Sequence, residues 1–230
     1  MEWALLSLRT GSPRPFGPRG QPSAIHKLPV SEAVYLDRTG FASDQQGDPR
    51  HHGGPEKAVH HYPAEHYAVW QHDLAGLRRV RNLRIGGFGE NISTLGLTEA
   101  NVSIGDVFRL GEALIQVSQP RQPCWKLNVR FNVKDMALRV QNSGRPGWYC
   151  RVLEPGLVSP AEALRRIERP SPQWTLRRVL SVLYRDCLNR DELAELAALP
   201  GLTMKMRDLL SRRLSQWSVE DWSARLDGDM

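Results

Sequence analysis

Residues 118–126, with the sequence SQPRQPCWK, constrain the fold more than any other stretch of this chain. Pro120 and Pro123 each fix the backbone φ angle and remove a hydrogen-bond donor, so the segment is predicted to be extended and stiff. It follows residues 106–118, where alternating apolar residues on both sides of Gly111 predict a β-hairpin. The sequence therefore predicts a strand that ends in a rigid loop, and this loop carries Cys124.

Cys124 has cationic neighbours within this loop. Arg121 precedes it and Lys126 follows it, and nearby positive charge favours the thiolate form of a cysteine. A thiolate attacks electrophiles and binds soft metal ions. The local pattern also fits a small apolar cysteine packed in a core, and both interpretations stay open at this point.

The remainder of residues 1–168 is predicted to be mainly β-structure with a few helices. Apolar, strand-like runs alternate with segments rich in Gly and Pro. The expected strands lie at residues 3–8, 33–36, 58–62 and 148–153, with a loop at residues 11–22. Helices are expected at residues 65–74, at residues 128–139, and from Ser159, which forms a capping box with Glu162.

The sequence pattern changes after residue 168. A linker with two prolines at residues 169–174 leads into apolar residues at helical spacing, and Asn189 with Glu192 forms a second capping box. The predicted organisation is a first domain at residues 1–168, a linker at 169–174 and a small three-helix domain at 175–230. The three expected helices lie at residues 175–186, 191–199 and 204–217.

Positive charge is concentrated in the first part of the chain. The net charge is +6; residues 1–150 hold 18 Lys+Arg and 13 Asp+Glu (+5), and residues 151–230 hold 13 and 12 (+1). A basic cleft near Cys124 would suit an anionic ligand such as a phosphorylated cofactor, with a mildly basic surface that binds nothing as the alternative. Three helices could also form a DNA-binding helix-turn-helix, but phosphate contacts need surplus Lys and Arg, so we expect no nucleic-acid partner.

The cysteine count and the hydropathy pattern predict a cytoplasmic protein. Three cysteines are an odd number, and no CxxC spacing joins them, which favours reduced thiols over a disulfide scaffold. No apolar run approaches the ~20 residues that span a bilayer. The first ten residues lack the basic region of a signal peptide. We therefore expect no membrane association.

Residues 39–57 form a second dense segment, rich in glycine and containing His51 and His52. Glycines allow backbone N–H groups to approach a ligand closely. Together with His60 and His61 these histidines could suggest zinc, but their spacing matches no zinc motif. A loop that lines an active site is the favoured interpretation, with a plain surface loop as the alternative.

Several different short motifs follow one another in a specific order along nearly the whole chain. They are QPSAI at 21–25, HGGP at 52–55 with Lys57, GEN at 89–91, Gly-Asp at 105–106, VSQPRQPCWKL at 117–127, and residues 145–156 before the three-helix tail. In this combination the chain resembles the MOSC domain family, named for the C-terminal domain of molybdenum cofactor sulfurases, and within it the YiiM-like proteins. One departure is Ser43, which stands before Asp44 where the family pattern has glycine.

The resemblance implies a mixed, mainly β fold: a β-barrel-like MOSC domain with peripheral helices, followed by a small three-helix domain. It also implies a molybdenum–pyranopterin cofactor, with Cys124 as the protein ligand to the metal. Related proteins reduce N-hydroxylated compounds such as hydroxylaminopurines and N-hydroxycytosine, and so detoxify base analogues. The alternative is a protein that binds or carries the cofactor without turnover.

The resemblance also assigns roles to residues and partners. Cys124, His51 and His52 are the expected catalytic residues, and Lys27 and Arg121 are the candidates for the cofactor phosphate. No flavin or iron–sulfur motif is present, so a separate reductase of flavin or ferredoxin type is expected to supply electrons to the small-molecule substrate. The C-terminal helices are expected to dock a protein, either this donor or a second copy in a homodimer. The full expected cofactor-binding set is Ser23, Lys27, His52, Lys57, Asn91, Arg121 and Cys124.

Overall fold

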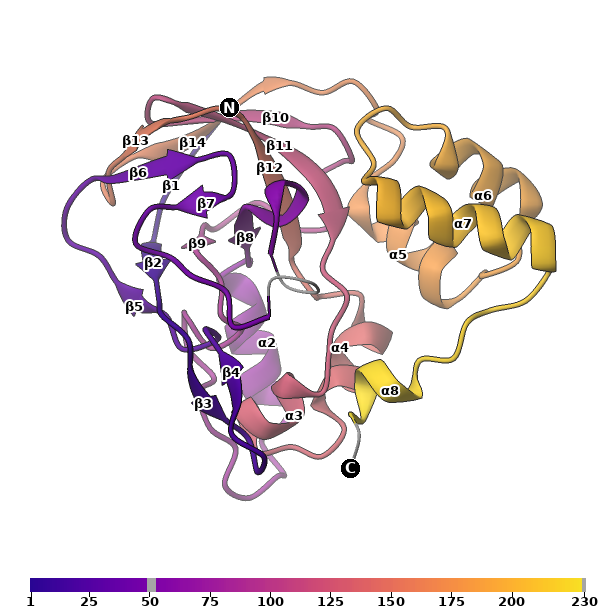
Figure 1. The fold of residues 1–230 in the computed structure, drawn as a ribbon, viewed down its shortest axis with the longest axis horizontal. Coiled ribbons are helices and arrows are strands. Elements are labelled where there is room, and N and C mark those ends of the chain that lie inside the picture. The colour runs from indigo at the N-terminus through magenta and orange to yellow at the C-terminus, as the bar shows by residue number, and fades with distance from the viewer. Residues whose placement is uncertain (49–52, 229–230) are drawn as a thin grey trace.

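The computed structural model describes residues 1–48 and 53–228. This part of the chain forms one large curled sheet, two smaller β-elements and a set of helices (Figure 1). The strands are β1 (Glu2–Ala4), β2 (Ser7–Thr10), β3 (Arg14–Phe16), β4 (Gln21–Ser23), β5 (Leu28–Pro29), β6 (Val34–Asp37), β7 (Gly40–Phe41), β8 (Val59–His61), β9 (Ile92–Ser93), β10 (Val107–Leu110), β11 (Ala113–Pro120), β12 (Trp148–Glu154), β13 (Gly156–Val158) and β14 (Ala163–Glu168). The helices are η1 (Pro55–Lys57), α2 (Glu65–Asp73), α3 (Lys126–Phe131), α4 (Met136–Ser143), α5 (Leu176–Tyr184), α6 (Arg190–Ala197), α7 (Met204–Gln216) and α8 (Ser223–Leu226).

The large sheet is a half-barrel. Within the described residues its strand order is β1-β14-β10-β11-β12-β8-β9-β2-β5. β1 and β2 lie toward opposite ends of this order, yet only Leu5 and Leu6 join them. Because a chain advances at most about 3.6 Å per residue, the sheet must curl until its two ends lie close together. The predicted mixed, mainly β, barrel-like fold is confirmed.

The N-terminal strands differ from the prediction in one respect. The single strand expected at residues 3–8 is divided, because β1 pairs with β14 whereas β2 pairs with β5 and β9. Between them Leu5 N donates to Glu162 O at 3.0 Å, on the β14 side of the break. Residues 11–22, expected to be a loop, contain most of the hairpin β3–β4.

Two helix predictions are also corrected. The helix expected at residues 128–139 is divided into α3 and α4, because Asn132 adopts the left-handed conformation (φ 56°) and ends α3. The helix expected from Ser159 does not form. Ser159 Oγ accepts a hydrogen bond from Ala161 N (3.3 Å) in a turn, and the chain continues as β14. β14 pairs with β1 on one side and β10 on the other, and this pairing outweighs the local capping signal.

The other predicted elements are present within a residue or two of the expected bounds. They include the hairpin β10–β11, the strands β6, β8 and β12, and the helices α2, α5, α6 and α7. Asn189 caps α6 as predicted, since its side chain accepts from Glu192 N at 3.2 Å. The short helix α8 was not anticipated from the sequence.

The C-terminal helices share one hydrophobic core with the sheet. Leu176 and Val179 of α5 belong to the same buried cluster as Val117 of β11 and Ile104. Trp174, within the expected linker, is fully buried, and its carbonyl accepts from Ile104 N at 3.0 Å. Helices α5, α6 and α7 therefore pack beside the sheet, whereas α8 returns next to α3 and α4 (Figure 1).

Candidate functional site

Cys124 lies in the loop between β11 and α3, and the C-terminal segment holds this loop in place. Arg225 of α8 donates from Nη1 to Pro123 O at 2.5 Å, and its carbonyl accepts from Trp125 N at 2.8 Å. The residues on both sides of Cys124 are thus bonded to one arginine. The rigidity that the two prolines predict is reinforced by a part of the chain a hundred residues away.

Cys124 lines two cavities that adjoin one another. The inner cavity has a volume of about 80 Å³ and reaches Arg121, His60 and Asn91. The outer cleft has a volume of about 730 Å³ and opens toward α7 and α8. This larger volume falls within the range of roughly 300–1,000 Å³ that is usual for small-molecule sites. Both cavities share Gly47, Asp48, Lys57, Cys124, Lys126 and Tyr149.

Six of the seven residues expected to bind the cofactor meet at the inner cavity. They come from four separate segments of the chain: Ser23, Lys27, Lys57, Asn91, Arg121 and Cys124. Their individual roles stay predictions. His51 and His52 lie outside the described residues, so their expected catalytic roles are untested.

Arg121 lines the inner cavity, and one nitrogen of its guanidinium group has no partner among the described residues. The residue is only 6% exposed, and its Nη1 has no hydrogen-bond partner among the described residues. The guanidinium carbon lies 5.9 Å from the centre of the Phe88 ring. Unpaired buried donors are rare in folded proteins, so this atom is suited to an acceptor that enters the cavity.

His60 lines the same cavity and also has a buried atom without a partner among the described residues. Its Nε2 has no hydrogen bond within the described part of the chain. Burial, together with the charge of Arg121, holds the pKa of His60 well below its ordinary value. His60 is therefore neutral at physiological pH, and it offers one nitrogen to a ligand without adding positive charge.

Lys27 and Asn91 are tied to a buried carboxylate. Lys27 Nζ forms an ion pair with Asp44 and lies 2.6 Å from Oδ2, and Asn91 Nδ2 donates to the same oxygen at 2.9 Å. Asn91 Oδ1 also accepts from His60 N at 3.0 Å. Burial lowers the pKa of Lys27, and the charge of Asp44 opposes that shift. Asp44 compensates the charge of Lys27, and its bonds to Lys27 and Asn91 hold this part of the cavity wall together. Arg121 is therefore the stronger candidate for binding a phosphate.

Lys57 stands at the end of η1, close to the aromatic ring of Tyr149. Its Nζ lies 5.7 Å from the ring centre. Burial and the nearby charge of Lys205 lower the pKa of Lys57, whereas Cys124 raises it. Ser23, at the end of β4, accepts from Ile25 N at 3.3 Å through its hydroxyl oxygen.

Close packing against β4 requires glycine at position 47, which the sequence alone did not reveal. A Cβ atom there would lie 2.4 Å from Pro22 O, so only glycine lets this segment approach β4. Gly47 thereby lets its loop pack against β4, the strand that carries Ser23.

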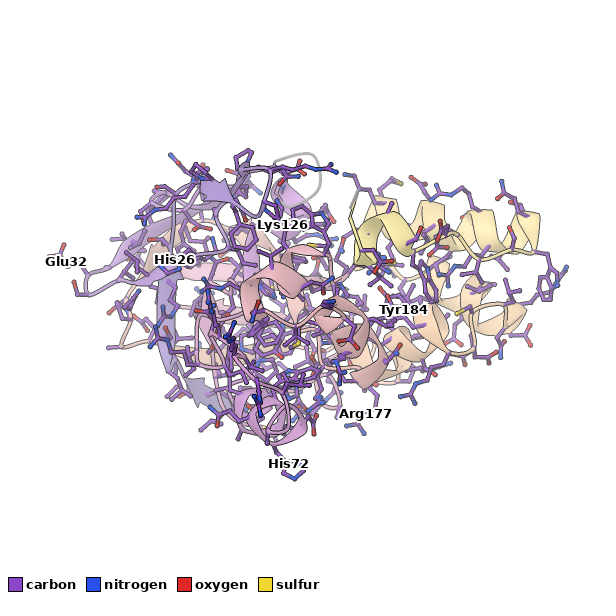
Figure 2. The ribbon with its side chains drawn as sticks, turned by 90° about the horizontal axis from the view of Figure 1, so that it is seen from below. His26, Glu32, His72, Lys126, Arg177 and Tyr184 are labelled. Atoms are coloured by element: carbon purple, nitrogen blue, oxygen red, sulfur yellow. The ribbon has the colours of Figure 1, made fainter. Side chains whose placement is uncertain are left out.

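Two residues of the site were not singled out from the sequence: Tyr149, which lines both cavities, and Lys205, which lines the outer cleft. His60, considered only for zinc, and Lys126, noted only as a cation beside Cys124, line the inner cavity. Lys126 lies near the middle of the molecule, whereas Glu32, His72 and Arg177 project at its edges (Figure 2). Tyr149 and His60 occupy paired positions on β12 and β8, a relation that no local sequence pattern reveals.

Metal ligation by a histidine and carboxylate cluster is not supported within the described residues. No group of three or more His, Cys, Asp or Glu side chains is arranged there to hold a metal ion. His61, considered with the other histidines, is bonded to Thr94 Oγ1 at 3.0 Å, and burial lowers its pKa to about 3. A soft metal held by Cys124 and by sulfur donors of its own cofactor needs no such cluster.

Comparisons with known proteins were made for the whole chain. The MOSC domain profile matches residues 48–165, and the profile of the YiiM-like 3-alpha helix domain matches residues 174–216. Protein YiiM of Escherichia coli is 40% identical over 211 residues, which cover 92% of this chain and 93% of that protein. Its crystal structure superposes with a TM-score of 0.83 at 34% identity, covering 98% of each chain.

Two further relatives extend this picture. YflK of Bacillus subtilis is 46% identical over 81% of this chain and 83% of its own length. A protein of Gibberella moniliformis that bears the name "Reductase" is 34% identical over 91% of this chain, which spans only 37% of that longer protein. No helix in the described ranges is long and apolar enough to cross a membrane. The fold, the two profiles and the close relatives agree, and the chain therefore belongs to the MOSC domain family, in its YiiM-like group.

Proposed function

We propose that this protein is an oxidoreductase that binds a molybdenum–pyranopterin cofactor and reduces N-hydroxylated bases to the parent amines. The observation that carries the proposal is the position of Cys124, which lines both the inner cavity and the outer cleft. A residue at that junction can contact a cofactor on one side and a substrate on the other. Membership of the MOSC family and the reductase name of one relative support the same class of activity.

The residues present fit such a cofactor. Cys124 would supply a soft thiolate ligand to molybdenum. The unpartnered Nη1 of Arg121 fits a phosphate oxygen, and the inner cavity has room for a group of that size. The neutral His60 offers its unpartnered Nε2 to the same group or to the pterin.

The reaction consumes two electrons and two protons for each substrate molecule. The N–O bond breaks, the oxygen leaves as water, and the amine remains. The bound cofactor supplies the two-electron redox chemistry, and a separate flavin or iron–sulfur reductase renews its electrons. Among the protein groups, Lys57 is placed to deliver a proton toward the departing oxygen, because it lines both cavities together with Cys124.

The test compares Cys124→Ser with Cys150→Ala in protein made by a host that synthesises the cofactor. Cys150 is buried in β12, where burial raises the pKa of its thiol far above the ordinary value, and it lines neither cavity. With a chemical reductant and 6-hydroxylaminopurine, we expect activity in the parent and in Cys150→Ala, and none in Cys124→Ser. Molybdenum and pterin analysis of each sample shows whether cofactor loading is preserved.

Two results would contradict the proposal. Full activity in a folded, cofactor-loaded Cys124→Ser variant would show that the thiolate of Cys124 is not needed for the reaction. Firm cofactor binding by the parent without turnover of any N-hydroxylated base would favour a carrier. Arg121→Ala provides an independent readout, because we expect it to lower cofactor content more than it lowers the melting temperature of the cofactor-free protein.

A further inference from the structure

The outer cleft is built jointly by the MOSC domain and the C-terminal helices. Cys124, Lys57 and Tyr149 line it on the side of the sheet, and Lys205 of α7 and Arg225 of α8 line it on the other. The cleft of about 730 Å³ is therefore incomplete without the three-helix domain. The C-terminal helices thus contribute directly to the wall that faces Cys124.

The lining of this cleft carries an excess of positive charge. Among the described residues that line it, four are cationic, namely Lys57, Lys126, Lys205 and Arg225, and one, Asp48, is acidic, which gives 4 − 1 = +3. The cations influence one another, since the charge of Lys205 helps to lower the pKa of Lys57. Such a concentration of like charge favours an anion that enters the cleft.

Lys205 is held at this position by the way α7 begins. Thr203 caps the helix through Met206 N (3.3 Å), and its hydroxyl donates to Gln119 Oε1 of β11 (3.1 Å). The start of α7 is thereby attached to the strand that leads into the Cys124 loop. Lys205 follows two residues later and is exposed to solvent at the mouth of the cleft.

An anion bound in the outer cleft would be a different group from the phosphate of the proposed cofactor. That phosphate matches the buried Nη1 of Arg121 in the inner cavity, and a single phosphate cannot also occupy the outer cations. The cleft retains its own positive charge beside Cys124 and has an aromatic ring, Tyr149, on its wall. A planar base with a phosphate attached matches both features, since the base can pack beside the Tyr149 ring and the cations can bind the phosphate.

We infer that the outer cleft binds the phosphate group of the substrate, and that the substrate class is an N-hydroxylated nucleoside monophosphate in addition to the free base. Lys205 is the residue from the C-terminal domain that recognises this phosphate. The inference rests on the proposed function, because it concerns the substrate side of the same site.

The experiment measures binding of the reaction product to the cofactor-loaded protein. Adenosine 5′-monophosphate and adenosine are titrated calorimetrically against the parent, Lys205→Ala, Lys205→Glu and the control Arg212→Ala. Arg212 is exposed on α7 and lines neither cavity. We expect the monophosphate to bind more tightly than adenosine and Lys205→Ala to weaken it about fivefold, the loss typical of one exposed ion pair. Lys205→Glu should weaken it further, and Arg212→Ala should leave it unchanged.

Kinetics with the N-hydroxylated nucleotide and the free base give a second readout. We expect the ratio of the two kcat/KM values to fall in Lys205→Ala and not in Arg212→Ala. Equal affinity of the parent for adenosine and its monophosphate would overturn the inference while leaving reduction of free bases intact. Loss of cofactor in Lys205→Ala would also overturn it, because the cleft cations would then hold the phosphate of the cofactor. Absence of all turnover, with phosphate-dependent binding preserved, would instead count against the proposed reaction alone.

Discussion

Replacement of Arg225 by alanine tests whether the C-terminal segment holds the Cys124 loop in place. The guanidinium group donates to Pro123 O at 2.5 Å and to Gln141 Oε1 at 2.6 Å. Gln141 is only 3% exposed, so its amide oxygen would lose this bond in a place that water reaches poorly. A buried polar group left unpaired costs about 1–3 kcal/mol, and the carbonyl of Pro123, which is also buried, loses its partner as well.

These contributions add to a loss of about 3 kcal/mol in the free energy of unfolding. For a chain of this length, each kcal/mol shifts the melting temperature by roughly 2–4 °C, so a fall of roughly 6–12 °C is expected. The measurements are the melting temperature by calorimetry and the molybdenum and pterin content of protein from a cofactor-producing host. Cofactor content should fall as well, because Pro123 adjoins Cys124.

Arg225→Lys separates the geometry of the guanidinium from its charge. A lysine keeps the charge but cannot make two divergent hydrogen bonds in a fixed plane, so it should recover only part of the stability. The reasoning would be refuted if Arg225→Ala kept both the melting temperature and the cofactor content of the parent. Loss of stability with full cofactor content would show that α8 supports the fold but does not position the loop.

Two further predictions concern buried charge. Asp44→Asn leaves Lys27 buried without its counter-ion and should lower the free energy of unfolding, measured by urea denaturation, by about 3–5 kcal/mol. The control Glu32→Gln, at an exposed position, should change it by less than about 0.5 kcal/mol. His61 is neutral in the folded state because its pKa is lowered to about 3, whereas the unfolded chain binds a proton below about 6.5. The contribution of His61 should therefore lower stability by up to about 1.4 kcal/mol per pH unit between pH 6.5 and 5, and the buried His60 adds a decline of the same sign. His61→Gln should flatten that decline in a series of urea midpoints, and an equally steep decline in the variant would exclude His61 as its source.

Because the sheet and the helices share one core, a deletion of residues 170–230 is a poor test of the expected docking role of the C-terminal helices. Leu176 and Val179 pack in the same cluster as Val117, so removing the helices exposes a large apolar surface of the sheet. Such a deletion is expected to unfold or aggregate the remainder, and it cannot isolate a role in docking an electron donor. Single substitutions on exposed positions of α5 to α7, such as Arg177, test that role without opening the core.

Local sequence predicted a stiff loop with cations around Cys124, because proline stiffness and neighbouring charges act within a few residues, and the structure places this residue at the junction of two cavities. The resemblance to a family then added Ser23, Lys27, Lys57, Asn91 and Arg121, which all reach the inner cavity. Local patterns failed at Ser159, where a good capping signal lies next to a segment that pairs with strands on both sides. Pairing partners far along the chain decided that conformation, and no local propensity reports them.

The sequence by itself determined the elements whose signals are short-range: the hairpin β10–β11, the capped helix α6, the stiff loop and the basic character of the first part of the chain. Only the tertiary structure decided which charges remain available. Asp44 compensates Lys27, whereas Arg121 keeps an unpaired nitrogen, although both appear in the sequence as cations near turns. The structure also brought Lys205 and Arg225 to the cleft beside Cys124. The physical reason is that charge pairing and cavity walls arise from contacts between segments that the curled sheet brings together, and sequence spacing carries no record of those contacts.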